Sequence, residues 1–120
     1  MSFASPAQEA LADTITVGEY LVRDHEASFL LEVTGDAMEG VGILAGDTVI
    51  FERGVVAKPG DIVIVLTEDG YYMRYLRQSA RSGKNGGAYF LEAANEKYEN
   101  LQPKEGQIIG VVVATFRKYV

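Results

Sequence analysis

The sequence predicts a mainly β domain, a twisted barrel or sandwich of short strands with little helix. Short runs rich in Val, Ile, Phe and Tyr recur along the chain, separated by turns containing Gly or Pro. The length of 120 residues suits one hydrophobic core. Apolar residues make up 48% of the chain and charged residues 23%, as in ordinary folded proteins.

Six strands are expected, and each is bounded by a turn signal. A Gly-Asp pair precedes the second strand, Pro59 and Gly60 precede the third, and the Asp69-Gly70 turn closes a hairpin to the fourth. A polar, glycine-rich loop covers residues 79–87. The expected strands are residues 29–33, 48–52, 61–66, 71–76, 88–93 and 107–119.

The chain before the first strand has weaker signals. We expect residues 1–27 to form an N-terminal arm and connecting segment, and residues 28–120 to form the β domain. Within the arm, residues 8–12 favour helix, and residues 15–22 fit either a turn of helix or a short extended piece.

The last strand is apolar without alternation, as is the third. This pattern indicates burial on both faces, or one face against another subunit. A C-terminal strand is also a natural pairing edge, so a homodimer is expected. The residues expected to form its interface are Val111, Val112, Val113 and Phe116.

Charge and composition narrow the partners and the compartment. The 17 acidic residues outnumber 11 basic ones, and no DNA-reading helix is recognisable, so direct nucleic acid binding is not expected. The longest apolar run, residues 108–114, is too short to cross a membrane. The chain has no cysteine, which fits a reducing cytoplasm, and no secretory signal is visible.

The usual catalytic and metal-binding patterns are missing from the sequence. His25, the only histidine, lies in a charged stretch and is expected to be a surface residue, so neither a Ser-His-Asp triad nor a metal site is predicted. The glycine-rich residues 83–87 open no helix, and no phosphate-binding motif is present. No cofactor is expected.

The most informative segment is the turn G-D-A-M at 35–38, followed by G-I-L-A-G-D at 42–47. Together with later blocks, this order of motifs resembles the LexA/UmuD family of self-cleaving proteins with a Ser-Lys peptidase fold. The later matching blocks are G-D-I-V at 60–63, the strand at 72–76, the L-x-x-x-N-x-x-Y pattern at 91–98 and the closing strand at 110–113.

The N-terminal arm is closest to the UmuD branch of this family. F-A-S-P-A at 3–7 is similar to the segment that follows the cleavage point in UmuD-like proteins, and residues 15–22 continue the similarity. Val17-Gly18 is an alternative match to the Ala-Gly bond that LexA cuts, although its register favours the UmuD alignment.

The resemblance assigns the catalytic positions to residues that cannot perform the reaction. The family serine falls on Ala37, which has no hydroxyl, and the family lysine on Arg74, whose guanidinium does not deprotonate in proteins. The oxyanion-hole amides fall on Asp36 and Ala37, and Gly35 and Met38 complete the turn. We therefore expect no self-cleavage, whether the two losses are natural or engineered.

A purely structural interpretation of the two positions stays open. Ala37 is then a small turn residue, and Arg74 a strand residue that pairs with a carboxylate such as Asp36 or Glu39. A relocated dyad using Ser28, Ser79 or Ser82 lacks a lysine placed beside it by any motif.

The resemblance implies a UmuD-like regulatory subunit of the DNA-damage (SOS) response. Such a subunit is a homodimer that binds an error-prone Y-family translesion polymerase, and recombinase filaments are further partners. The alternatives are the C-terminal dimerisation domain of a LexA-like or phage-type repressor, and a Ser-Lys peptidase inactivated by mutation.

Overall fold

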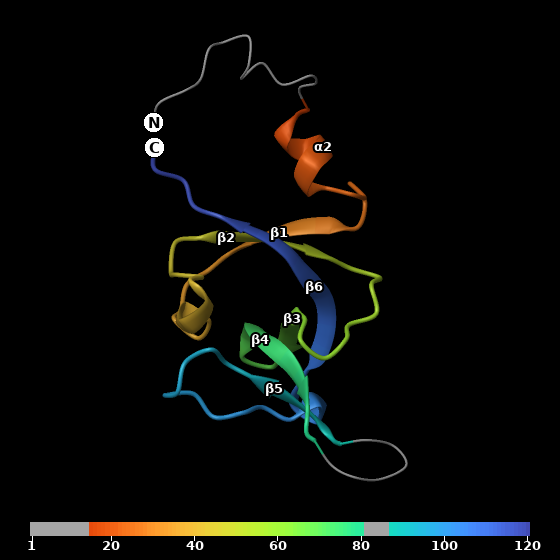
Figure 1. The fold of residues 1–120 in the computed structure, drawn as a ribbon, viewed down its shortest axis with the longest axis vertical. Coiled ribbons are helices and arrows are strands. Elements are labelled where there is room, and N and C mark those ends of the chain that lie inside the picture. Colours follow the sequence, from red (N-terminus) through yellow and green to blue (C-terminus); the bar gives the residue numbers. More distant parts are fainter. Residues whose placement is uncertain (1–14, 81–86) are drawn as a thin grey trace.

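The computed structural model describes residues 15–80 and 87–120, which form one antiparallel sheet of six strands (Figure 1). The strand order is β1-β2-β6-β3-β4-β5, and the sheet curves without closing into a barrel. The strands are β1 (Ser28–Glu32), β2 (Thr48–Glu52), β3 (Ile62–Thr67), β4 (Gly70–Gln78), β5 (Tyr89–Glu92) and β6 (Gln107–Phe116). The helices are α2 (Val17–Leu21) and the short 3-10 turns η1 (Glu39–Val41) and η2 (Pro103–Glu105).

The mainly β prediction is confirmed, and each expected strand is present with small shifts at its ends. β4 extends to Gln78, where it still pairs with β5, and β6 stops at Phe116. Residues 15–22 form a turn of helix because the Thr16 side chain accepts a hydrogen bond from the Glu19 backbone and caps α2. The F-A-S-P-A motif and the helix-prone residues 8–12 lie outside the described residues.

The C-terminal strand lies inside the sheet, so the expectation that it forms an edge is wrong for much of its length. Residues 107–111 pair with β3, and residues 111–116 pair with β2. The ladder skips one β6 residue in each pairing, Ile109 and Val113, and such bulges bend a strand. Figure 1 shows β6 curving through the molecule, so that one strand joins the β1–β2 half to the β3–β4–β5 half.

The bend requires a glycine at position 110. A Cβ there would lie 2.4 Å from the Phe51 ring and 2.8 Å from the carbonyl oxygen of Glu52. Only a residue without a side chain therefore lets β6 pass this close to β2.

The strand β3 is buried on both faces, as its unbroken apolar sequence predicts. Ile64 joins a first core with Met38, Ile43, Val49 and Phe51. Val63 and Val65 point the other way, into a second core with Leu76, Leu91 and Val111. The curved sheet thus separates two clusters, and the first lies under the 35–47 segment that carries the main motif.

The N-terminal segment is tied to the sheet by one ion pair. Arg23, just after α2, donates from Nη2 to the buried carboxylate of Glu52 at 2.6 Å and from Nε at 3.1 Å. His25 is exposed, as expected. The longest described helix, α2, has five residues, so no helix in this part of the chain is long enough to span a membrane.

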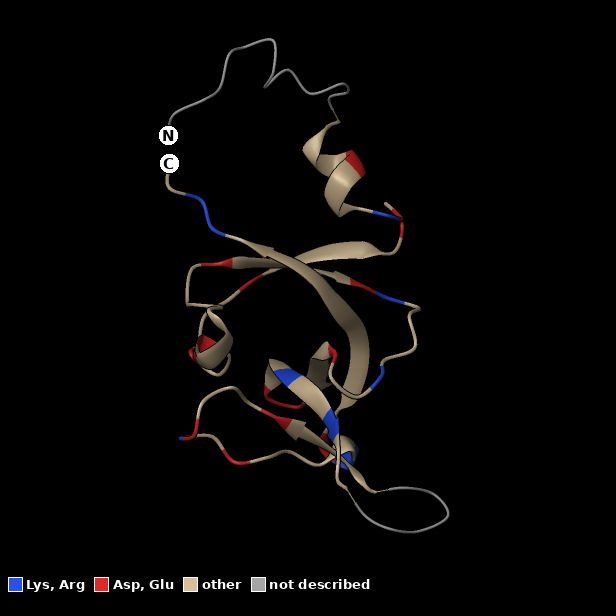
Figure 2. Ribbon diagram, in the orientation of Figure 1, with Lys and Arg blue, Asp and Glu red and all other residues tan. Residues whose placement is uncertain are grey.

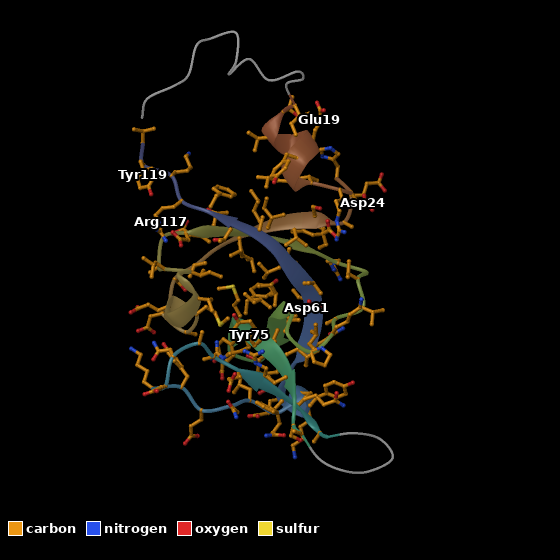
Figure 3. The ribbon with its side chains drawn as sticks, in the orientation of Figure 1. Glu19, Asp24, Asp61, Tyr75, Arg117 and Tyr119 are labelled. Atoms are coloured by element: carbon orange, nitrogen blue, oxygen red, sulfur yellow. The ribbon has the colours of Figure 1, made fainter. Side chains whose placement is uncertain are left out.

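A buried carboxylate holds the 42–47 segment in place. Asp47 is 2% exposed and accepts a hydrogen bond from the Leu44 backbone at 2.8 Å. Arg117 donates to both of its oxygens, at 2.6 and 2.9 Å, from just beyond the end of β6 (Figure 3). These contacts lower the pKa of Asp47 to about 2. The hydrogen bonds from Arg117 have the largest effect, and the one from the Leu44 N–H has the next largest.

This pKa predicts an acid-sensitive contribution to stability. A carboxyl whose pKa is depressed by folding stabilises the native state above its unfolded pKa, near 3.8, and this contribution is lost as the pH falls through about 2. Urea unfolding from pH 5 to pH 2 should therefore show a steeper loss of stability for the unsubstituted protein than for Asp47→Asn.

The exposed Asp69 provides the matched control for that comparison. Asp69→Asn should keep the steep pH dependence. Equal pH profiles for Asp47→Asn and the unsubstituted protein would mean that Asp47 does not carry this effect.

Candidate functional site

A pocket of about 520 Å³ lies between the end of β1, the 35–38 turn and strand β4. Ala37 and Arg74, the two positions that the sequence singles out, both line it. Its floor is formed by core residues that include Met38, Val49 and Ile64, and tyrosines form part of its wall. The fold therefore brings together two motifs that are far apart in the sequence.

The turn carrying Ala37 is anchored by its neighbour. Met38 is 1% exposed and belongs to the first core, so its side chain fixes the turn from below. Ala37 is half-buried, and Gly35 lies beside it on the pocket wall. Among the described residues, no acceptor is found for the backbone N–H of Ala37.

Residues 95–98 hold this turn through contacts to Asp36, which we call the Asp36 clamp. Asn95 donates from Nδ2 to the Asp36 carbonyl oxygen at 2.9 Å. The Asp36 carboxylate accepts a hydrogen bond from the Tyr98 hydroxyl and pairs with Lys97 Nζ at 2.5 Å. The contact with Lys97 has the larger effect and the hydrogen bond from Tyr98 the next, and both lower the pKa of Asp36. The same contacts raise the pKa values of Lys97 and Tyr98.

A glycine lets the two segments of the clamp approach. The Gly40 N–H donates to the carbonyl oxygen of Ala94 at 2.7 Å, and a Cβ at Gly40 would lie 2.5 Å from that oxygen. Any side chain at position 40 would push residues 94–98 away from the turn.

Arg74 places a positive charge inside the pocket wall. It is 6% exposed, and its guanidinium lies 5.2 Å from the centre of the Tyr72 ring and 5.3 Å from that of Tyr98. Nη1 donates to the Met73 carbonyl oxygen at 2.8 Å, whereas the buried Nε has no partner. Burial lowers the pKa of Arg74, and Tyr98 and Tyr72 act in the opposite direction.

The expected pairing of Arg74 with a carboxylate is not present. No ion pair of Arg74 occurs among the described residues; Asp36 is held by Lys97 and Tyr98 instead, and Glu39 is exposed. The nearby Arg77 on the same strand does form a pair, with Glu92 at 3.1 Å. Figure 2 shows both basic positions of β4.

The pocket offers neither a nucleophile nor a base at positions 37 and 74, where the sequence resemblance expects them. Ala37 ends in a methyl group, and an arginine side chain stays protonated in proteins. Lys97 is engaged by Asp36, which favours its charged form. Ser28 and Ser79 do not line the pocket. No group of three or more His, Asp or Glu residues that could hold a metal ion is found within residues 15–80 and 87–120.

The four residues expected at a dimer interface are placed unequally. Val111 is buried in the second core, and Val112 packs against the first. Val113 is 38% exposed, and Phe116 is half-buried. Beyond Val111, one edge of β6 pairs with β2, and the other edge pairs with no strand among the described residues.

Comparison with known proteins places these features in a family. The Peptidase S24-like family matches residues 1–113 of the chain. The chain belongs to this family. The match therefore covers the G-D-A-M turn, Arg74 and the Asp36 clamp in one continuous region.

Curated relatives include protein SamA and two LexA repressors. The chain is 30% identical to protein SamA of Salmonella typhimurium over 97% of its own length and 78% of that protein. It is 34% identical to the LexA repressor of one Clostridium perfringens strain, over 94% of its own length, and 33% identical to that of another strain. The chain spans about half, 53%, of the length of these LexA repressors.

The clamp residues were not assigned a role from the sequence. Asn95 and Tyr98 belong to a block that the family resemblance recognised, so the signal for them was present. Their effect on the turn depends on a contact between residues 59 and 62 positions apart in the chain, which no local pattern reveals.

The clamp predicts a measurable change in the acidity of Asp36. Tyr98→Phe removes one of the hydrogen bonds that favour the carboxylate, so the pKa of Asp36 should rise towards its ordinary value. Lys97→Met should raise it further because the Lys97 contact is the larger cause. Carbon-13 NMR of the carboxyl group during a pH titration measures both changes.

Tyr71→Phe is the control for this titration, since Tyr71 is exposed and lies on the same strand as Arg74. It should leave the Asp36 pKa unchanged. A Tyr98→Phe protein with the same Asp36 pKa as the unsubstituted protein would exclude the clamp in solution.

Proposed function

We propose that this chain is a UmuD-like regulatory subunit of the DNA-damage response that forms a homodimer, binds an error-prone translesion polymerase and does not cleave itself. The observation that carries the proposed loss of self-cleavage is the shared pocket. Ala37 and Arg74 line it together, at the positions where the family resemblance expects the serine nucleophile and the lysine base.

The loss of cleavage follows from the chemistry of these two side chains. Acyl transfer by this family needs a hydroxyl to attack the peptide bond, and alanine has none. It also needs a base that is neutral near physiological pH. Burial lowers the pKa of Arg74 but does not remove its proton, since arginine starts from so high a value.

The UmuD-like assignment is supported by the sequence of the arm. F-A-S-P-A at 3–7 is similar to the UmuD-like arm, and the family match includes this region. We expect the arm to contact the polymerase, with recombinase filaments as further partners, in the cytoplasm.

The second candidate is the C-terminal domain of a LexA-like or phage-type repressor. The 34% identity to a LexA repressor favours it. A helix-turn-helix segment encoded upstream would support the repressor, and an adjacent polymerase gene would support the UmuD-like subunit.

An active-site probe tests the proposed loss of cleavage directly. A fluorophosphonate forms a covalent bond with an activated serine. It should not label the unsubstituted protein or Ala37→Ser, but should label the double variant Ala37→Ser/Arg74→Lys at position 37. Labelling should increase towards alkaline pH, where the introduced lysine loses its proton.

Peptide mass spectrometry identifies the labelled position in that experiment. Labelling of the unsubstituted protein, or its self-cleavage at alkaline pH, would contradict the proposal. An unlabelled double variant would show that the site has lost more than these two side chains.

The proposed dimer uses residues 112–116 of β6, which pair with β2 along one edge and with no described strand along the other. Because Val111 and Val112 already pack inside the chain, the accessible contacts are the Val113 side chain and the backbone edge of residues 112–116. Val113→Lys places a charge at that interface, so it should raise the dimer dissociation constant by at least about tenfold, measured by sedimentation equilibrium.

Val56→Lys is the matched control, because Val56 is 81% exposed in the loop between β2 and β3 and is not part of β6. It should leave the dimer unchanged. A purified Y-family polymerase should then bind the dimeric protein and its Val56→Lys variant in a pull-down. A monomeric unsubstituted protein would contradict the dimer, and an absence of polymerase binding would favour the repressor candidate.

A further inference from the structure

The pocket contains a charged group whose hydrogen bonds are incomplete. Arg74 is 6% exposed, and its Nε is buried without a partner. Nη1 is used by the Met73 carbonyl oxygen, and no partner of Nη2 is found among the described residues. Buried charges in native proteins are normally paired, since an unpaired one loses its hydration without compensation.

The surroundings of Arg74 explain how the charge is tolerated but do not neutralise it. The faces of Tyr72 and Tyr98 lie 5.2 and 5.3 Å from the guanidinium carbon and stabilise the cation weakly. No carboxylate pairs with it in the described part of the chain, because Asp36 is already engaged by Lys97 and Tyr98. Nη2 therefore has donor capacity available for an anion, whereas Nε is enclosed by the protein.

We propose that this pocket binds the carboxylate of a peptide, with Arg74 as the residue that recognises it. A carboxylate oxygen can accept a charge-assisted hydrogen bond from Nη2. Ala37 lines the same pocket, and its backbone N–H is a further donor without an acceptor among the described residues.

The shape and lining of the pocket indicate which carboxylate it accepts. About 520 Å³ lies within the ~300–1,000 Å³ range of small-ligand sites. Leu31, Val33 and Met73 supply apolar contacts for the side chains beside the carboxylate. The exposed carboxylates of Glu32 and Asp69 also line the pocket, and they repel a phosphate dianion more strongly than a singly charged carboxylate.

This inference rests on the proposed function in one respect, namely that the pocket does not cut the peptide it binds. Two sources of the carboxylate are distinguishable, the C-terminus of a peptide and an Asp or Glu side chain. Three synthetic peptides separate them: acetyl-Ala-Leu-Val-Ala with a free C-terminus, the same peptide with a C-terminal amide, and an amidated version with Glu in place of the last Ala.

Binding is measured by NMR titration of the nitrogen-15 labelled protein, following the Arg74 Nε–H and the Ala37 amide. The free-acid peptide should shift both signals and bind at least about tenfold more tightly than its amide, as expected for one charge-assisted contact. This comparison needs no protein variant. Tight binding of the amidated Glu peptide would also support the proposal and would assign the carboxylate to a side chain.

Two variants then assign the preference to Arg74. Arg74→Met removes the charge but keeps an apolar chain, and it should abolish the difference between acid and amide. Arg77→Met, on the same strand but outside the pocket lining, should preserve it.

The proposal is overturned if the acid and amide bind equally, if no peptide binds at millimolar concentration, or if Arg74→Met keeps the acid preference. Mass spectrometry of the peptides after the titration measures whether they were cleaved, independently of whether they bind. Cut peptide would contradict the proposed loss of cleavage, whereas the binding preference tests the role of Arg74.

Discussion

The contact between Asp36 and residues 95–98 holds the turn that forms one wall of the pocket. The 35–38 turn has no strand partner of its own, and Met38 holds it only from the core side. Asn95, Lys97 and Tyr98 hold it from the other side, through the carbonyl and carboxylate oxygens of Asp36. Tyr98 also contacts Arg74 with its ring, so one residue links the turn to strand β4.

If Arg74 occupies the family's lysine position, as proposed, this chain keeps the pocket and changes its chemistry. A neutral lysine suits a buried base because desolvation removes its proton. An arginine in the same strand keeps its proton, and it needs aromatic faces and hydrogen-bond acceptors to lie there. The tyrosine rings and the Met73 carbonyl oxygen supply part of that requirement and leave donors unused. Under the proposed function, a site for proton transfer in the family becomes in this chain a site that attracts anions.

The bend of β6 connects this pocket to the rest of the molecule. Because the strand crosses from β3 to β2 at Val111, the β1–β2 pair and the β3–β4 pair face one another across the first core (Figure 1). The pocket opens between these two halves. Arg117, just beyond the bend, also holds the buried Asp47, which ties the motif segment to the same strand.

The sequence by itself determined the β class, the six strands, the hairpin at 68–70 and the family motifs, because these depend on local residue patterns and short-range turn chemistry. It also predicted, through the family resemblance, that Ala37 and Arg74 belong to one site. Only the tertiary structure decided that β6 is central, that Asp36 pairs with Lys97 instead of Arg74, and that Arg74 has no carboxylate partner among the described residues. These outcomes depend on contacts between distant segments, where several carboxylates and cations compete and packing selects among them.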